Sequence, residues 1–343
     1  MCGIMVLFHS WSLHHERNLF SFNPMTRFLI LIVTVFVLSG SLLAAEESML
    51  RQTERGYDIA IDGQPFAGYV TDEKGTPIIW PIFGPTGKKM SRDFPMIERN
   101  DTTEAKDHLH HRSLWFNHGD VNGVDFWAIK NVKMKTGKIV HRRFVEAKSD
   151  GQTATLVTEN DWKDNDEQVL CSDVRTLRFG KTDGMRYIDF DVTVTAVLDQ
   201  VVFADTKEGS LGFRVPGTMD VDAKKRNPEW GGRIVNAEGL TDDAAWAKRS
   251  AWVDYTGPVE GETLGIAILN HPSSFRYPTY WHVRTYGLFA ANPFGIHDFE
   301  KKEEKIGELV LKKGESFTVR YRLLFHRQDA DIAKAFEKYA AMK

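Results

Sequence analysis

The feature that most constrains the fold is a strict alternation of apolar and polar residues in two distant segments. In residues 188–196, Ile, Phe, Val, Val and Ala alternate with acidic and hydroxyl side chains, and residues 317–325 repeat the pattern with Thr and Arg on the second face. A period of two places each set on one side of an extended chain. Both segments are therefore predicted as half-buried β-strands.

Weaker strand patterns recur along the chain between turn signals such as Asp62-Gly63 and residues 181–184. They cover residues 58–61, 78–83, 139–146, 154–158, 174–179, 211–215, 264–269 and 286–291. Helical spacing is found only near the C-terminus, where residues 332–340 place apolar side chains on one face. We predict an all-β, mostly antiparallel fold: a large two-sheet β-sandwich with one C-terminal helix.

The N-terminal segment has the order of a secretory signal. Residues 28–38 form an apolar run of eleven, preceded by Arg27 and followed by small residues and then Glu46-Glu47. This order predicts export to the periplasm or the medium, with an uncleaved membrane anchor as the alternative. We expect residues 1–45 to comprise an upstream extension and the signal peptide, with Met25 as the true start, and residues 46–343 to form a single domain.

Composition narrows the classes of function. With 42% hydrophobic and 27% charged residues the chain is neither disordered nor fibrous, and its net charge of −3 comes without a basic block that would bind nucleic acid. Cys2 and Cys171 are too few for a disulfide framework or a thiolate zinc site. Glycine fingerprints for nucleotides and the Gly-x-Ser-x-Gly elbow are not found.

The most unusual segment contains four histidines within residues 108–118. Imidazoles at this spacing suit proton transfer by His108, His110 or His111, and equally suit a divalent metal held by His108 and His110, which share a face if the segment is extended. The alternative is a set of histidines that bond loop carbonyls. The neighbouring residues predicted to bind substrate are Arg112, Trp115, His118, Asp125 and Trp127.

A second segment, residues 270–295, combines aromatic rings, histidines and arginines between prolines. Rigid rings with polar tips are typical of ligand pockets, although a well-packed loop would have the same composition. The predicted substrate-binding residues are His271, Trp281, His282 and Arg284, of which His282 and Arg284 share parity in a strand.

A third segment, Lys207-Glu208-Gly209, leads into an apolar strand that contains an internal arginine. Glu208 is predicted as a proton-transfer group, and the alternative is a solvated surface ion pair.

With these residues in view, the sequence resembles a family of exported bacterial proteins labelled "methane oxygenase PmoA". The matching stretches are residues 80–85, 107–127, 207–209 and 271–295. The resemblance implies a β-sandwich similar in outline to the galactose-mutarotase-like proteins. The methane-oxidising subunit of that name is a bundle of transmembrane helices, whereas residues 46–343 contain no apolar run of about 20 residues, so we interpret the label as a misnomer.

These observations favour a secreted or periplasmic carbohydrate-active enzyme, a hydrolase, lyase or epimerase that uses a histidine and Glu208 for proton transfer and requires no cofactor. The predicted partner is a small molecule or oligosaccharide. Two alternatives remain: a non-catalytic carbohydrate-binding protein, and a metal enzyme with histidine ligands. The enzyme hypothesis requires the three segments to meet in space.

Overall fold

A computed structural model describes residues 49–100 and 102–342. Residues 48–343 form one compact unit, built from two eight-stranded antiparallel sheets. The segment predicted as a signal peptide lies outside the described residues.

The first sheet, which carries the candidate site, is assembled from five N-terminal strands and three strands from later in the chain. Its order is β1 (Leu50–Thr53), β2 (Gly56–Ile61), β3 (Gln64–Val70), β4 (Ile78–Ile82), β5 (Leu114–His118), β13 (Gly209–Arg214), β18 (Leu288–Asn292) and β17 (Tyr280–Val283).

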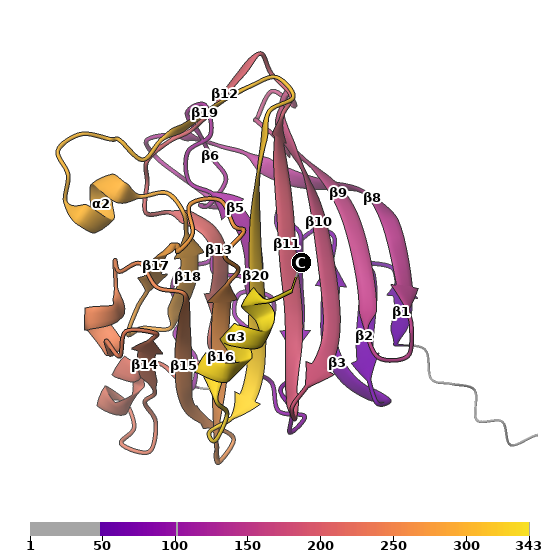
Figure 1. Ribbon diagram of the computed structural model, residues 1–343, viewed down its shortest axis with the longest axis vertical. Coiled ribbons are helices and arrows are strands. Elements are labelled where there is room, and N and C mark those ends of the chain that lie inside the picture. The colour runs from indigo at the N-terminus through magenta and orange to yellow at the C-terminus, as the bar shows by residue number, and fades with distance from the viewer. Residues whose placement is uncertain (1–48, 101, 343) are drawn as a thin grey trace, which may run out of the picture. The chain divides into compact units, whose positions relative to one another are not determined.

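The second sheet contains the longest strands, including the two segments with the strict alternation. Its order is β14 (Arg233–Asn236), β15 (Trp252–Val259), β16 (Glu262–Asn270), β20 (Ser316–Arg327), β11 (Met185–Ala196), β10 (Val169–Thr182), β9 (Ala154–Lys163) and β8 (Lys138–Ser149). Figure 1 shows these strands running side by side, with β20 and β11 adjacent.

Short elements connect the sheets. Two small pairs, β12 (Gln200–Phe203) with β19 (Leu309–Lys312) and β6 (Val124–Asp125) with β7 (Lys135–Thr136), lie at their margins, and the second pair is parallel. The described helices are the 3₁₀ turns η1 (Val221–Lys225) and η2 (Asp242–Ala245) and the α-helices α2 (Ile296–Glu300) and α3 (Ile332–Ala340).

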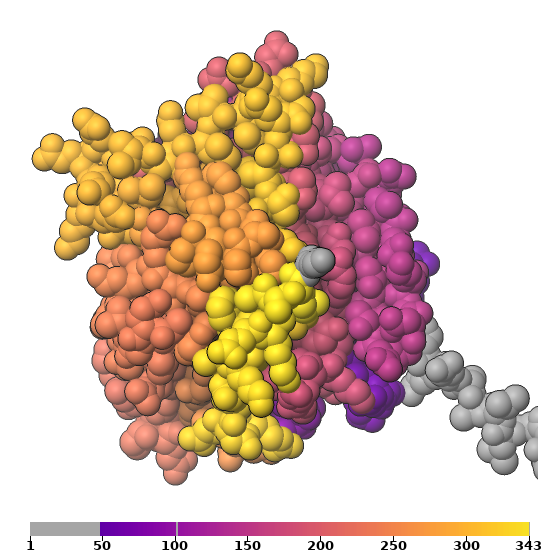
Figure 2. Space-filling model, viewed as in Figure 1, coloured from indigo at the N-terminus to yellow at the C-terminus, as the bar shows by residue number. Residues whose placement is uncertain are grey.

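The main core lies between the two sheets because the inward residues of both alternate with outward ones. Along β9 buried and half-buried side chains alternate without exception. Asp331 accepts a hydrogen bond from the Lys334 amide and begins α3, which lies across the outer face of the second sheet (Figures 1 and 2). The outer face of the second sheet is therefore partly covered by α3. The candidate site lies on the outer face of the first sheet.

The prediction of an all-β antiparallel sandwich with a C-terminal helix is confirmed. Every segment predicted as a strand overlaps an observed one. The sequence patterns missed α2 and ten of the observed strands: β1, β3, β5, β6, β7, β12, β14, β15, β17 and β19. Most of these strands are short or buried on both faces, so they lack a period of two.

Candidate active site

The outer face of the first sheet, turned away from the second sheet, carries its own cluster of buried side chains. On β5, Leu114 and Phe116 point into the main core, whereas Trp115 lies in a separate cluster with Trp127 and Leu288. Strand alternation therefore presents every second residue of β5, β13, β18 and β17 on this face. We call it the histidine face, after the three histidines that lie above Trp115: His108, His110 and His111.

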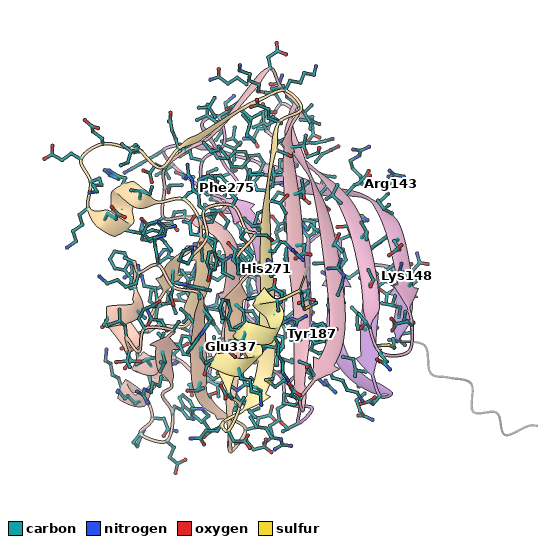
Figure 3. The ribbon with its side chains drawn as sticks, viewed as in Figure 1. Arg143, Lys148, Tyr187, His271, Phe275 and Glu337 are labelled. Carbon is teal, nitrogen blue, oxygen red and sulfur yellow. The ribbon has the colours of Figure 1, made fainter. Side chains whose placement is uncertain are left out.

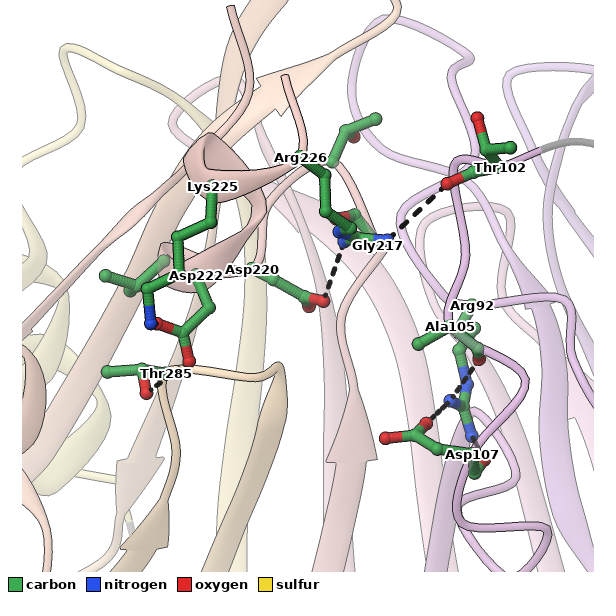
Figure 4. Close-up of polar contacts among 12 residues, drawn as sticks. Arg92, Thr102, Ala105, Asp107, Gly217, Asp220, Asp222, Lys225, Arg226 and Thr285 are labelled. Atoms are coloured by element: carbon green, nitrogen blue, oxygen red, sulfur yellow. Dashed lines mark hydrogen bonds and ion pairs between the residues drawn. The ribbon is translucent and has the colours of Figure 1, made fainter. Parts of the chain in front are cut away.

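The loop that carries these histidines is organised by Arg92. Its buried guanidinium donates to the Asp107 carboxylate at 2.7 Å. It also donates to four backbone carbonyls, those of Ala105, Asp107, His108 and His111, at 3.0–3.2 Å. Figure 4 shows Arg92 against Ala105 and Asp107. These bonds hold His108 at a φ of 45°, in the left-handed region that side chains other than glycine seldom adopt.

His108 and His111 are held in complementary proton states. Nδ1 of His108 lies 2.7 Å from Oδ2 of Asp107, and because a carboxylate only accepts, Nδ1 carries the proton and Nε2 of the neutral ring keeps a lone pair. Nδ1 of His111 lies 3.0 Å from Nη1 of Arg214, which only donates. His111 therefore accepts at Nδ1 and carries its proton on Nε2. The two rings are parallel, with centroids 4.6 Å apart.

Burial and neighbouring charges shift the pKa values of Asp107, His111 and His110. Partial burial opposes ionisation of Asp107, but Arg214, His108 and Arg92 together hold its pKa below the usual range. Burial, followed by the charge of Arg214, lowers the pKa of His111 well below its ordinary value. Burial and then His108 lower the pKa of His110 to about 4. His110 and His111 are therefore neutral at neutral pH.

Trp115 and Trp127 form the floor beneath the histidines. Trp115 lies flat against Gly212 of β13, where a Cβ atom would stand 2.4 Å from the indole ring. Both rings are nearly inaccessible, with exposed fractions of 0% and 2%. The prediction that these rings stack on a ligand does not fit this burial, and they support the imidazoles instead. Asp125 orders the loop after β6, because it accepts from the Trp127 amide at 2.8 Å.

Glu208 reaches the histidine face from the segment before β13. Its backbone carbonyl accepts from the Gly119 amide at 2.7 Å, and its carboxylate bonds to Lys207 Nζ at 2.7 Å. The charge of Glu208 acts on His110, where it counteracts the lowering of the pKa, and on Tyr286. The Glu208 carboxylate is 35% exposed.

The segment around β17 completes the face. Tyr286 stacks on His108 with centroids 5.1 Å apart, and the Arg214 guanidinium lies 5.3 Å from the centre of the Tyr286 ring. His282 donates from Nδ1 to the Lys207 carbonyl at 3.0 Å, and burial, followed by the charge of Arg284, lowers its pKa to about 3. Residues 270–295 thus contact the histidine loop through Tyr286, and they contact the segment of Lys207 through His282.

Two predicted site residues face the main core instead. His118 shares parity with Phe116, lies against Phe203 and Phe294, and bonds through Nε2 to the Ala204 carbonyl at 2.9 Å. Trp281 is fully buried and donates to the Ser250 carbonyl at 3.0 Å. The parity of a strand separates them from their neighbours Asn117 and His282.

Two further predicted residues contact other parts of the fold. Arg112 is buried and donates to the carbonyls of Glu73 and Lys74, so it holds the turn between β3 and β4. His271 lies on the second sheet beside α3, where its ring centroid is 5.0 Å from that of Tyr339 and Nε2 is 3.0 Å from the Met342 carbonyl (Figure 3). Neither side chain joins the histidine face, although the charge of Arg112 reaches His110.

The burial of His118 predicts a pH dependence of stability. Burial lowers its folded pKa from 6.5 to about 4. Between about pH 6.5 and about pH 4, His118 binds a proton in the unfolded chain but not in the folded chain. The free energy of unfolding therefore falls by about 3 kcal/mol for this group as the pH drops through that range. Urea unfolding midpoints measured across that range should fall less steeply for His118→Phe than for the wild type. Equal slopes would contradict the assignment.

Sequence reasoning missed Asp107, Arg92, Arg214 and Tyr286. Two signals pointed to them: Asp107 directly precedes His108, and Arg214 interrupts an otherwise apolar strand. Arg92 lies 16 residues before His108, and only the fold brings its guanidinium to the loop.

Among residues 49–100 and 102–342, no group of three or more His, Cys, Asp or Glu side chains is arranged to hold a metal ion. His108 and His110, the predicted metal ligands, contact each other through their rings, with centroids 5.6 Å apart. No helix in this part of the chain has the length and apolar character needed to cross a membrane.

The fold and this face define an antiparallel β-sandwich with histidines, arginines and a carboxylate gathered on one outer sheet surface. The chain belongs to the family of unknown function DUF6807, whose model matches residues 56–340. The family description states no activity, and the label methane oxygenase stays a prediction. A search of the curated proteins found no match.

Solved structures with some similarity include carbohydrate-active enzymes. Heparan sulfate lyase HepC from Pedobacter heparinus has 9% identity and a TM-score of 0.41, over 90% of this chain and 41% of that one. The galactosidase domain of AgaSK has 9% identity and a TM-score of 0.44, over 80% and 41%. A putative aldose 1-epimerase from Escherichia coli K12 has 12% identity and a TM-score of 0.31, over 76% and 98%. This chain spans about two fifths of the length of the first two.

Proposed function

We propose that this chain is an exported carbohydrate-active enzyme, a hydrolase, lyase or epimerase that transfers a proton at a sugar bound on the histidine face. The observation that carries the proposal is the stacked imidazole pair. His108 offers a lone pair on Nε2, and His111 offers a proton on Nε2. Proton transfer at a sugar carbon or oxygen needs one group of each kind.

The roles follow from the contacts of each ring. Asp107 orients His108 as the general base, in the manner of a carboxylate–histidine pair. His111, neutral and held by Arg214, donates a hydrogen bond to an oxygen that gains negative charge. His110 is half-buried and Glu208 is 35% exposed, and either can serve as a second group that transfers a proton. Tyr286 is the half-buried ring available to a sugar. The proposal requires no cofactor.

The proposal is tested by a screen of the purified protein against neutral and acidic oligosaccharides and polysaccharides. New reducing ends, ultraviolet absorbance from unsaturated products and NMR detection of epimer exchange distinguish hydrolase, lyase and epimerase. We expect turnover with at least one class and a pH–rate profile that reports the groups of this face. Saturable binding without turnover across the screen would overturn the enzyme proposal in favour of a carbohydrate-binding protein.

A further inference from the structure

Arg284 differs from the other arginines near the histidine face because its guanidinium has no acceptor. Arg214 bonds to His111 and Asp107, Arg92 bonds to Asp107 and four carbonyls, and Arg112 bonds to two carbonyls. Among the residues that the structure describes, neither an ion pair nor a hydrogen bond involves the side chain of Arg284. The Nε atoms of all four arginines are buried without a partner, so the difference lies in the terminal nitrogens of Arg284, which are not buried.

The guanidinium is nevertheless held in place. Its Cζ lies 4.7 Å from the centre of the Trp246 ring, a cation–π contact that fixes the plane of the group while leaving its edge free. Arg284 directly follows β17, which carries His282 on the same face. Its charge acts on the pKa values of Lys207, His282 and Tyr286. The Arg284 amide donates to the Leu288 carbonyl at 2.7 Å, so the strand alternation that places His282 on the histidine face continues to Arg284.

The charges of this face do not cancel at Arg284. Asp107 is shared by Arg92 at 2.7 Å and Arg214 at 3.3 Å, and Lys207 is paired with Glu208 at 2.7 Å. Arg284 retains a positive charge that no side chain in the described residues neutralises through a direct contact. A planar guanidinium with free terminal N–H groups matches the two oxygens of a carboxylate, and such charge-assisted pairs are the strong hydrogen bonds of binding sites.

We propose that the ligand of the histidine face is an acidic sugar, a uronic acid residue, whose carboxylate is bound by Arg284. This inference rests on the proposed function and deepens it by naming the substrate class. The ring of the sugar lies toward Tyr286 and His108, and its carboxylate meets the free edge of Arg284. A sulfated sugar presents a similar charge, so the test separates the two anions.

The test compares binding of oligosaccharides of galacturonate, glucuronate and mannuronate with binding of their methyl esters, which lack the negative charge and carry one added methyl group. Titration calorimetry on the full chain should show at least one free acid that binds about tenfold or more tightly than its ester. In Arg284→Gln this ratio should fall to about one, and Arg284→Lys should restore part of it. Because the side chain makes no hydrogen bond, the melting temperature of these variants should change little.

A matched control is Arg143→Gln, which removes an exposed positive charge on β8 of the second sheet and should leave the ratio unchanged. Equal binding or turnover of acids and esters by the wild type would overturn this inference while the proposed function stands. Preference for sulfated sugars without uronate binding, or a uronate preference that persists in Arg284→Gln, would also overturn it. The failure of every sugar to bind or react would overturn both.

Discussion

Replacing His108 with glutamine is expected to lower turnover of the sugar substrate by about 10²–10⁴-fold, because the chain loses its oriented general base. The Nε2 lone pair is available only while Asp107 accepts from Nδ1. The side chain is 39% exposed, so the substitution should leave the unfolding midpoint nearly unchanged.

The control for this experiment is Lys106→Gln. Lys106 belongs to the same loop and bonds to Glu98, with half of its side chain exposed and no contact with the imidazoles. This variant should retain activity. If His108→Gln turned over substrate at the wild-type rate in a folded protein, His108 would not be the base, and the proton transfer would have to pass to His110 or Glu208.

Replacing Asp173 with alanine is expected to lower the free energy of unfolding by about 3–5 kcal/mol, because it leaves the buried Arg175 guanidinium without its counter-ion. The Asp173 carboxylate accepts two bonds from Arg175 at 2.9 Å, one from Asn160 at 2.6 Å and one from Trp162 at 2.7 Å. Arg175 in turn donates to the Phe116 carbonyl at 3.3 Å and so links the second sheet to β5.

Denaturant unfolding followed by tryptophan fluorescence would measure this loss. The matched control is again Arg143→Gln, which breaks a surface ion pair with Glu159 and should shift the midpoint very little. A shift for Asp173→Ala as small as that of the control would show that the buried pair does not stabilise the sandwich.

The sequence patterns predicted strands best where one face of the sheet is buried and the other is exposed to solvent. Strands β11 and β20 pair from Arg186 with Phe325 to Thr195 with Ser316, and their alternation could be recognised because the inward residues fill the core. Strand β5 was not predicted, because all five of its residues are buried and Asn117 and His118 interrupt its apolar run, whereas the equally buried β18 has a longer apolar run. A strand covered on both sides has no polar alternation to read.

In the candidate site, too, the sequence predicted what depends on local spacing and not what depends on the tertiary structure. Local parity predicts His282 and Arg284 on one face, because their spacing of two residues decides it. Parity could not assign His108 and His110, because their loop is not extended and Arg92 sets its path. Nor could it show which face of each strand would meet the core, so His118 and Trp281 were placed in the site although both point inward.

By itself, the sequence determined the antiparallel β class, the C-terminal helix and the residue types that could transfer a proton, because these depend on local periodicity and side-chain chemistry. Only the tertiary structure decided which histidine accepts and which donates, and which arginine is left without a partner. Those properties depend on contacts between residues as far apart in the chain as His111 and Arg214. Strand pairing and burial create such contacts, and no local pattern in the sequence records them.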